Sequence, residues 1–202
     1  MKKLVLVVAS LLLIISASHA QSLQEKKVKT EIKSLSNTHD VKVKQEKKNL
    51  RHELRTLQGN DVSESSKSEF HKDFGTFPDE KWARTANYDK VNYTQDGTLT
   101  TAYYEGNSDV QKNSNLVGIF ADKHFADLPK NAQETINSKY KNYSKDKVLQ
   151  FHDNVNNDME MVMYGHELKD ADEYFMELSK DGKNLVLTIS KSGNVNYFSN
   201  MR

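Results

Sequence analysis

The chain has 202 residues, a formal net charge of +1 and no cysteine. The absence of cysteine excludes a disulfide scaffold, a thiol enzyme and a cysteine-based zinc site. The near-neutral charge gives no support for general binding of nucleic acid. A chain of this length is expected to form one domain, or one domain with an appendage.

The first twenty residues have the pattern of a secretory signal peptide. Two lysines precede an apolar run at residues 4–15, and small residues follow, with Ser18 and Ala20 at the −3 and −1 positions. The apolar run is much shorter than the roughly 20 residues that a membrane-spanning helix needs, which disfavours a membrane anchor. We therefore predict cleavage after Ala20, a periplasmic or secreted location, and no membrane span.

Residues 21–62 are predicted to form a basic tail. Residues 21–60 contain ten Lys/Arg and five Asp/Glu, whereas residues 61–202 contain 17 and 23. Apolar residues are sparse here, although Leu50, Leu54 and Leu57 have helical spacing. We expect the tail to be disordered or loosely helical and dispensable for folding. It is either a solvated linker or an electrostatic tether to an anionic surface, such as a membrane or the acidic remainder of the chain.

Residues 63–202 contain two segments with helical patterns. The first is residues 64–74, where Phe70 and Phe74 are four residues apart, and Gly75 ends it. The second begins at Pro129, which provides a rigid first turn. Its apolar stripe consists of Ala132, Ile136, Tyr140 and Tyr143. Between the two segments lies Trp82, the single tryptophan, which we expect to anchor the core or to pack a helix against the sheet.

Strand patterns and turn dipeptides fill most of the remaining sequence. The dipeptides Asp96-Gly97, Asp181-Gly182 and Ser192-Gly193 are typical of hairpin turns. Hairpins join antiparallel strands, so we predict an α+β domain with helices packed on one face of an antiparallel sheet. The predicted strands are residues 88–94, 99–105, 116–125, 147–153, 159–168, 173–179, 184–190 and 195–199.

The turns also predict which residues share a face of the sheet. A two-residue loop at Asp181-Gly182 pairs Leu178 with Leu185 and Met176 with Leu187, which gives an apolar face for the helices to cover. A similar loop at Asp96-Gly97 pairs Tyr93 with Thr100 and Val91 with Ala102, and one at Ser192-Gly193 pairs Leu187 with Phe198.

The opposite face is predicted to be open to water, as antiparallel sheets allow. It would carry Leu99, Tyr103, Phe175 and Tyr197 among polar residues. Aromatic side chains in polar surroundings are typical of partner-binding surfaces, so these four residues are the candidate partner-binding face. The alternative is that scattered exposed aromatics have no role.

Several segments together resemble a known family. They are Phe77-Pro78-Asp79-Glu80-Lys81-Trp82, a strand running into Asp96-Gly97, Leu128-Pro129-Lys130-Asn131-Ala132 opening a helix through Tyr140, and a terminal Asp-Gly meander. Over residues 63–202 this pattern resembles the PepSY-like exported proteins of Bacteroidetes, which are similar to the β-lactamase-inhibitor-protein (BLIP) fold. The resemblance implies a small periplasmic or secreted α+β unit without known enzymatic activity. Some relatives inhibit or regulate partner proteins, including peptidases, but no inhibitory contact motif matches here.

No catalytic, cofactor or metal site is predicted. None of the six histidines that remain after His19 is removed with the signal forms H-x-x-x-H or H-E-x-x-H. The polar segment 152–158 lacks the residue order of a calcium loop. The sequence also contains no G-x-S-x-G motif and no glycine-rich phosphate loop.

The leading hypothesis is a non-catalytic periplasmic or secreted module that binds or regulates an unidentified envelope protein or peptide, with an inhibitor-like role as a fold-level analogy. One alternative is a hydrolase that uses dispersed carboxylates. Another is a structural or stress-related envelope protein. A deep pocket with two facing carboxyl groups would favour the hydrolase, and a shallow open sheet face would favour binding.

Overall fold

The computed structural model describes residues 23–35, 41–57, 59, 61–105, 114–154, 161–169 and 171–201. The predicted signal peptide and its cleavage site after Ala20 lie outside these residues. Among the described residues, no helix is both long enough and apolar enough to cross a membrane.

The body is built on one eight-stranded sheet with the order β1-β2-β3-β4-β5-β8-β9-β10, in which every neighbouring pair is antiparallel. The α+β class is therefore confirmed. The strands are β1 (Lys81–Arg84), β2 (Asp89–Gln95), β3 (Thr98–Tyr104), β4 (Leu116–Lys123), β5 (Ser144–Asp153), β8 (Glu173–Lys180), β9 (Lys183–Ser190) and β10 (Val195–Met201). A separate two-stranded hairpin comprises β6 (Val162–Met163) and β7 (His166–Glu167).

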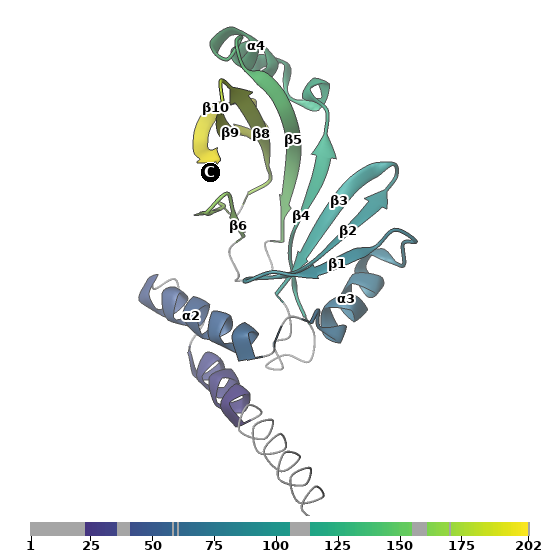
Figure 1. Ribbon diagram of the computed structural model, residues 1–202, viewed down its shortest axis with the longest axis vertical. Helices are drawn as coiled ribbons and strands as arrows, with labels where there is room; N and C mark the ends of the chain where they lie inside the picture. The colour runs from purple at the N-terminus through teal and green to yellow at the C-terminus, as the bar shows by residue number, and fades with distance from the viewer. Residues whose placement is uncertain are drawn as a thin grey trace, which may run out of the picture.

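Two helices pack on the same face of this sheet, as predicted, but at opposite ends of it (Figure 1). α3 (Glu64–Phe74) buries Phe70 against β2 and β3, and α4 (Lys130–Lys139) buries Ile136 against β5, β8 and β9. The cross-strand pairs Ala102–Ile119, Lys123–Val148 and Val148–Met176 connect the two covered areas along one face. A short 3₁₀ helix, η1 (Phe125–Asp127), leads into α4.

Local capping and packing explain where α3 lies. Ser63 is its N-cap and accepts a hydrogen bond from the Ser66 amide, which satisfies one of the free N–H groups of the first turn. Phe70 is fully buried, and the Trp82 ring packs edge-on against it with centroids 5.5 Å apart. Trp82 is half-buried and packs a strand of the sheet against α3, one of the two packing roles expected for it.

Two of the three predicted hairpins have the predicted register. Both residues of Asp96-Gly97 and of Asp181-Gly182 have positive φ, as a two-residue type I′ turn requires. The flanking pairs Gln95–Thr98 and Lys180–Lys183 close these loops. The pairs predicted across these two turns on the helix-covered face, such as Met176–Leu187, are therefore confirmed. The predicted Leu187–Phe198 pair is wrong, because Leu187 pairs with Tyr197.

The prediction of an open second face was wrong. The segment expected to form one strand over residues 159–168 turns back at Tyr164-Gly165, where both residues have positive φ, and forms the β6–β7 hairpin. Met161 and Leu168 of this segment are buried in a core that also includes Phe120, Phe151 and Phe175. The sheet is therefore covered on both faces, by helices on one and by the hairpin on the other.

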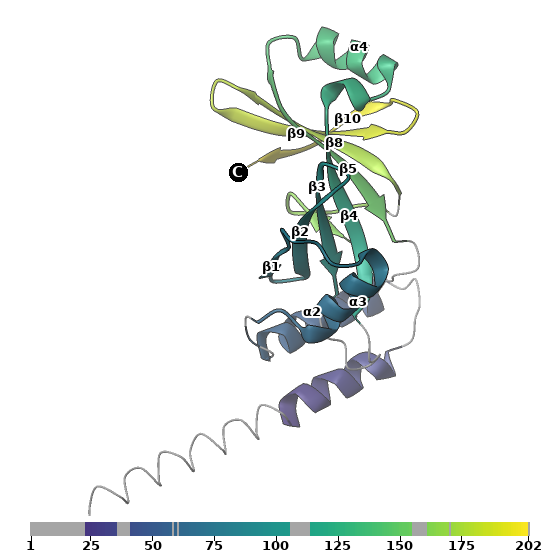
Figure 2. The ribbon, with the colours of Figure 1, turned by 90° about the vertical axis from the view of Figure 1, so that its right-hand side faces the viewer.

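The predicted tail is helical where it is described. Residues 23–34 form a helix, and α2 (Val41–Leu57) follows it. Val28, Ile32 and Leu54 are buried between these helices. Figure 2 shows both helices below the sheet. Of the two predicted states of the tail, disordered or loosely helical, these residues are in the helical one. The domain boundary at residue 62 stays a prediction.

Candidate functional site

The structure does not bring the four predicted face residues together. Leu99 and Tyr197 are exposed, at 47% and 57%, but Phe175 is 1% exposed. Tyr103 is half-buried against Tyr88 and Phe120, with ring centroids 5.7 and 5.8 Å away. Tyr197 pairs with Leu187 and therefore lies on the opposite face of the sheet from the other three. A surface composed of these four side chains is not formed.

The third hairpin explains the misplacement of Tyr197. Its loop has three residues, Lys191 to Gly193, because the Ser190 amide donates to the Asn194 carbonyl, and Gly193 has a φ of 85°. A three-residue loop ending in a left-handed glycine shifts the register by one residue compared with a two-residue loop. A bulge between Tyr197 and Ser199 then restores the expected pairing, which turns Phe198 into the hairpin-covered core.

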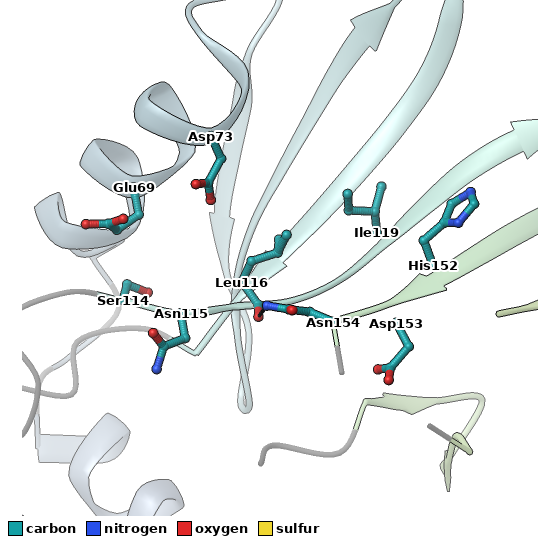
Figure 3. Close-up of a pocket in the computed structure, with 9 residues that line it drawn as sticks. All are labelled: Glu69, Asp73, Ser114, Asn115, Leu116, Ile119, His152, Asp153 and Asn154. Atoms are coloured by element: carbon teal, nitrogen blue, oxygen red, sulfur yellow. Dashed lines mark hydrogen bonds between the residues drawn. The ribbon is translucent and has the colours of Figure 1, made fainter. Parts of the chain in front are cut away.

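The described residues form a different candidate site, an open pocket of about 380 Å³ on the helix-covered face. Figure 3 shows that Glu69 and Asp73 project from α3, while the opposite wall comes from the start of β4 and the end of β5. Leu116 and Ile119 supply its apolar lining. The remaining lining residues are polar: Ser114, Asn115, His152, Asp153 and Asn154.

The two carboxylates from α3 have structural partners. Tyr104 donates its hydroxyl proton to Asp73 across 3.1 Å, and Lys72 is 3.0 Å from Glu69. Burial, together with the neighbouring Asp73 carboxylate, raises the pKa of Tyr104, so this hydroxyl remains a hydrogen-bond donor at any physiological pH. The α3 wall of the pocket is therefore acidic and held in place by the sheet beneath it.

A charged network fixes the β5 wall. Asp172 accepts hydrogen bonds from Lys191 at 2.7 Å and from the Asp153 amide at 3.1 Å, and its carboxylate lies 3.3 Å from His152 Nδ1. Burial by itself would raise the pKa of Asp172, but these contacts outweigh it and lower the pKa. Asp172 therefore stays ionised and orients both His152 and the backbone at Asp153.

The β4 wall is tied to the interior of the protein. Ser114 is 2% exposed and its hydroxyl lies 3.0 Å from that of Ser66 on α3. The Asn115 side chain donates to Glu105 across 3.2 Å, and the Asn115 carbonyl accepts from the Glu105 amide. Both residues are thus positioned by groups outside the pocket.

The arrangement suits binding better than hydrolysis. The pocket is open, and each α3 carboxylate is held by one neighbouring side chain while further acceptor positions on its oxygens remain. Within the described ranges, no group of three or more His, Asp or Glu side chains is placed to hold a metal ion. The pocket is acidic and partly apolar, and it is open to a side chain of another molecule.

Sequence reasoning missed this pocket because its walls come from three segments far apart in the chain. Among its lining residues, His152, Asp153 and Asn154 belong to the polar segment that lacks the residue order of a calcium loop. No periodic pattern or spacing motif connects Glu69 and Asp73 with Asn115, since their proximity depends on how α3 crosses the sheet.

The fold is similar to that of solved BLIP-like and DUF2874 family proteins from Bacteroides, which confirms the resemblance at the level of structure. A BLIP-like protein from Bacteroides fragilis superposes with a TM-score of 0.51 and 15% identity, covering 72% of this chain and 91% of that one. A DUF2874 family protein from Bacteroides uniformis gives 0.53 and 11%, covering 69% and 89%. A protein from Bacteroides eggerthii, inferred to be periplasmic, gives 0.53 and 12% with the same coverage. No family model matches the sequence, and no curated protein matches it.

Proposed function

We propose that this protein is an exported, non-catalytic module that binds a protein or peptide partner through the pocket between α3, β4 and β5. The observation that carries the proposal is the pocket itself, which is open and lined by both carboxylates and apolar side chains. The likeness in fold to BLIP-like and periplasmic Bacteroides proteins supports an envelope location and a binding role.

The lining favours a partner that presents a lysine or arginine side chain. Glu69, Asp73 and Asp153 contribute carboxylates, and no lysine or arginine is among the lining residues. The long aliphatic stem of a basic residue would lie against Leu116 and Ile119, while its cationic head would meet the carboxylates. Such a contact gives orientation and a faster association rate more than raw affinity.

The test is affinity capture from an envelope extract with the chain that begins at Gln21. Ile119→Arg places a cation and extra volume in the pocket lining, so it should abolish capture of a partner that the unaltered chain retains. Leu99→Arg adds the same charge on the opposite face at an exposed position, and it should leave capture unchanged. Near-ultraviolet circular dichroism checks that both variants are folded.

A partner retained equally by both variants would exclude the pocket as its binding site, and the absence of any partner above background would count against the binding function. The preference for a basic side chain is tested separately with N-acetyl-arginine methylamide. This probe should shift the backbone NMR signals of Asn115 and Ile119, whereas the uncharged citrulline analogue should not.

A further inference from the structure

Helix α2 is joined to the pocket by two parallel chains of polar contacts. The first begins at Arg51, whose Nε lies 3.1 Å from Glu105 Oε1. The other oxygen of Glu105 accepts from the side chain of Asn115, which lines the pocket. Glu105 is only 9% exposed, so its two partners share one carboxylate that is largely shielded from water.

The second chain begins one helical turn further along, at Arg55. Its Nη2 donates to Asp89 Oδ1 at 3.1 Å, and Asp89 Oδ2 accepts from the Ser66 hydroxyl at 2.8 Å. Because the single hydroxyl proton of Ser66 is committed to Asp89, Ser114 is the donor in the 3.0 Å contact between the two serines. Ser66, Asp89 and Ser114 are all at most 2% exposed.

Both chains end on adjacent pocket residues, Ser114 and Asn115. The two arginines are four positions apart and therefore lie on one face of α2. Lys48 continues the same face and pairs with Glu167 of β7, but Glu167 does not line the pocket. The contacts of Arg51 and Arg55 thus lead to the pocket, whereas the Lys48–Glu167 pair does not.

We propose that docking of α2 on the body controls the position of the β4 wall of the pocket, so that the basic N-terminal segment regulates the binding site. The inference rests on the proposed function of the pocket, but the coupling is a property of the free protein. When α2 is docked, Arg51 compensates the charge of Glu105, and Arg55 does so for Asp89. When it is detached, Glu105 loses Arg51, and Asp89 keeps only the more distant Arg84, 3.6 Å away. The two carboxylates that accept from Asn115 and Ser66 are then no longer held from the α2 side.

The experiment compares Arg51→Gln with Lys48→Gln in the isotopically labelled chain that begins at Gln21. Arg51 is chosen because its side chain is 22% exposed, so its replacement is better tolerated than that of Arg55. Arg51→Gln should shift the side-chain amide signals of Asn115 and the backbone signals of residues 114–116. Lys48→Gln removes an ion pair from the same helix face and should leave these signals unchanged.

A second measurement follows binding of N-acetyl-arginine methylamide. Arg51→Gln should weaken its binding by about 2- to 30-fold, the range for couplings of about 0.5–2 kcal/mol, and Lys48→Gln should not. Unchanged Asn115 signals in Arg51→Gln, or equal changes in both variants, would overturn the coupling. A probe that fails to bind the unaltered chain while Arg51→Gln still shifts Asn115 would instead contradict the basic-side-chain preference and leave the coupling intact.

Discussion

Arg55 of α2 and Asp89 of β2 form an ion pair that is almost completely shielded from solvent, with side chains 7% and 0% exposed. Arg55 also donates to the backbone carbonyls of Thr85 and Glu105. Desolvation lowers the pKa of Arg55, and the neighbouring Asp89 opposes that effect. The contact joins the predicted tail to the first residue of β2.

Arg55→Ala should destabilise the protein by about 3–5 kcal/mol, since it leaves the Asp89 carboxylate buried without its closest cation. Urea denaturation at pH 7 measures the loss. Lys48→Ala is the matched control on the same helix, and because the Lys48–Glu167 pair is about half exposed, its removal should cost less than about 1 kcal/mol. Equal effects of the two substitutions would contradict the role assigned to burial.

The same contact changes the expectation that the tail is dispensable. A chain that begins at Asp61 lacks Arg51 and Arg55, and it also exposes the surface that they cover. Its melting temperature should therefore fall well below that of the chain beginning at Gln21, as measured by thermal unfolding. Melting of the two chains within a few degrees of each other would show that α2 docks too weakly to stabilise the body.

Ile136→Ala should cost about 2–5 kcal/mol, as truncation of a buried isoleucine typically does. Ile136 is 0% exposed and packs against β5, β8 and β9. Ser138→Ala, at an exposed position of the same helix, should change stability by no more than about 0.5 kcal/mol. Denaturant unfolding compares them, and a cost under about 0.5 kcal/mol for Ile136→Ala would be incompatible with the packing of α4.

Phe175→Ala should reduce the free energy of unfolding much more than Tyr197→Ala, although the sequence predicts both residues on one face of the sheet. Phe175 packs against Phe120 and Phe198 beneath the β6–β7 hairpin, with ring centroids 6.0 and 5.3 Å away. Its truncation should cost about 3–5 kcal/mol. Tyr197 is 57% exposed, so its truncation should cost much less. Similar losses of unfolding free energy would contradict this assignment.

Local features of the sequence predicted β2, β3, β4, β5, β8, β9 and β10 and most registers, but they missed β1. The two Asp-Gly turns fix their flanking pairs within a few residues, and the stripe of Ala132 and Ile136 identifies the buried face of α4. The three-residue loop at Gly193 could not be distinguished from a two-residue loop, because a serine followed by glycine is compatible with both. The error displaced Tyr197 by one position and hence to the other face.

Coverage of the second face was indicated by a signal that the alternation argument overlooked. β4, β5, β8 and β9 carry apolar residues at both parities, as in Val148-Leu149 and Val186-Leu187. Strands buried on both faces have this composition. Neither the Arg55–Asp89 pair nor the pocket had such a signal, because both depend on contacts between segments that only the tertiary structure brings together.

The buried Tyr93 hydroxyl is expected to affect the stability of the protein. It is sealed beside Phe70 and Phe77, with ring centroids 4.9 and 4.7 Å away. It makes no hydrogen bond within the part of the chain that the structure describes. Burial raises the pKa of Tyr93 from 10.0 to about 12. An unpaired buried hydroxyl reduces stability, so Tyr93→Phe should leave the free energy of unfolding at pH 7 unchanged or increase it.

The raised pKa of Tyr93 also predicts how stability depends on alkaline pH. The unfolded chain releases this proton near pH 10, whereas the folded chain holds it until about pH 12. The stabilisation linked to the shift is therefore fully present below pH 10 and is lost as pH rises through 12. Tyr93→Phe should decline less steeply between pH 10 and 12, although Tyr88, whose pKa burial also raises to about 12, should preserve part of the decline. Urea denaturation at pH 8, 10 and 11 measures both slopes, and an equal or steeper decline in Tyr93→Phe would show that this hydroxyl is not buried in the protonated form.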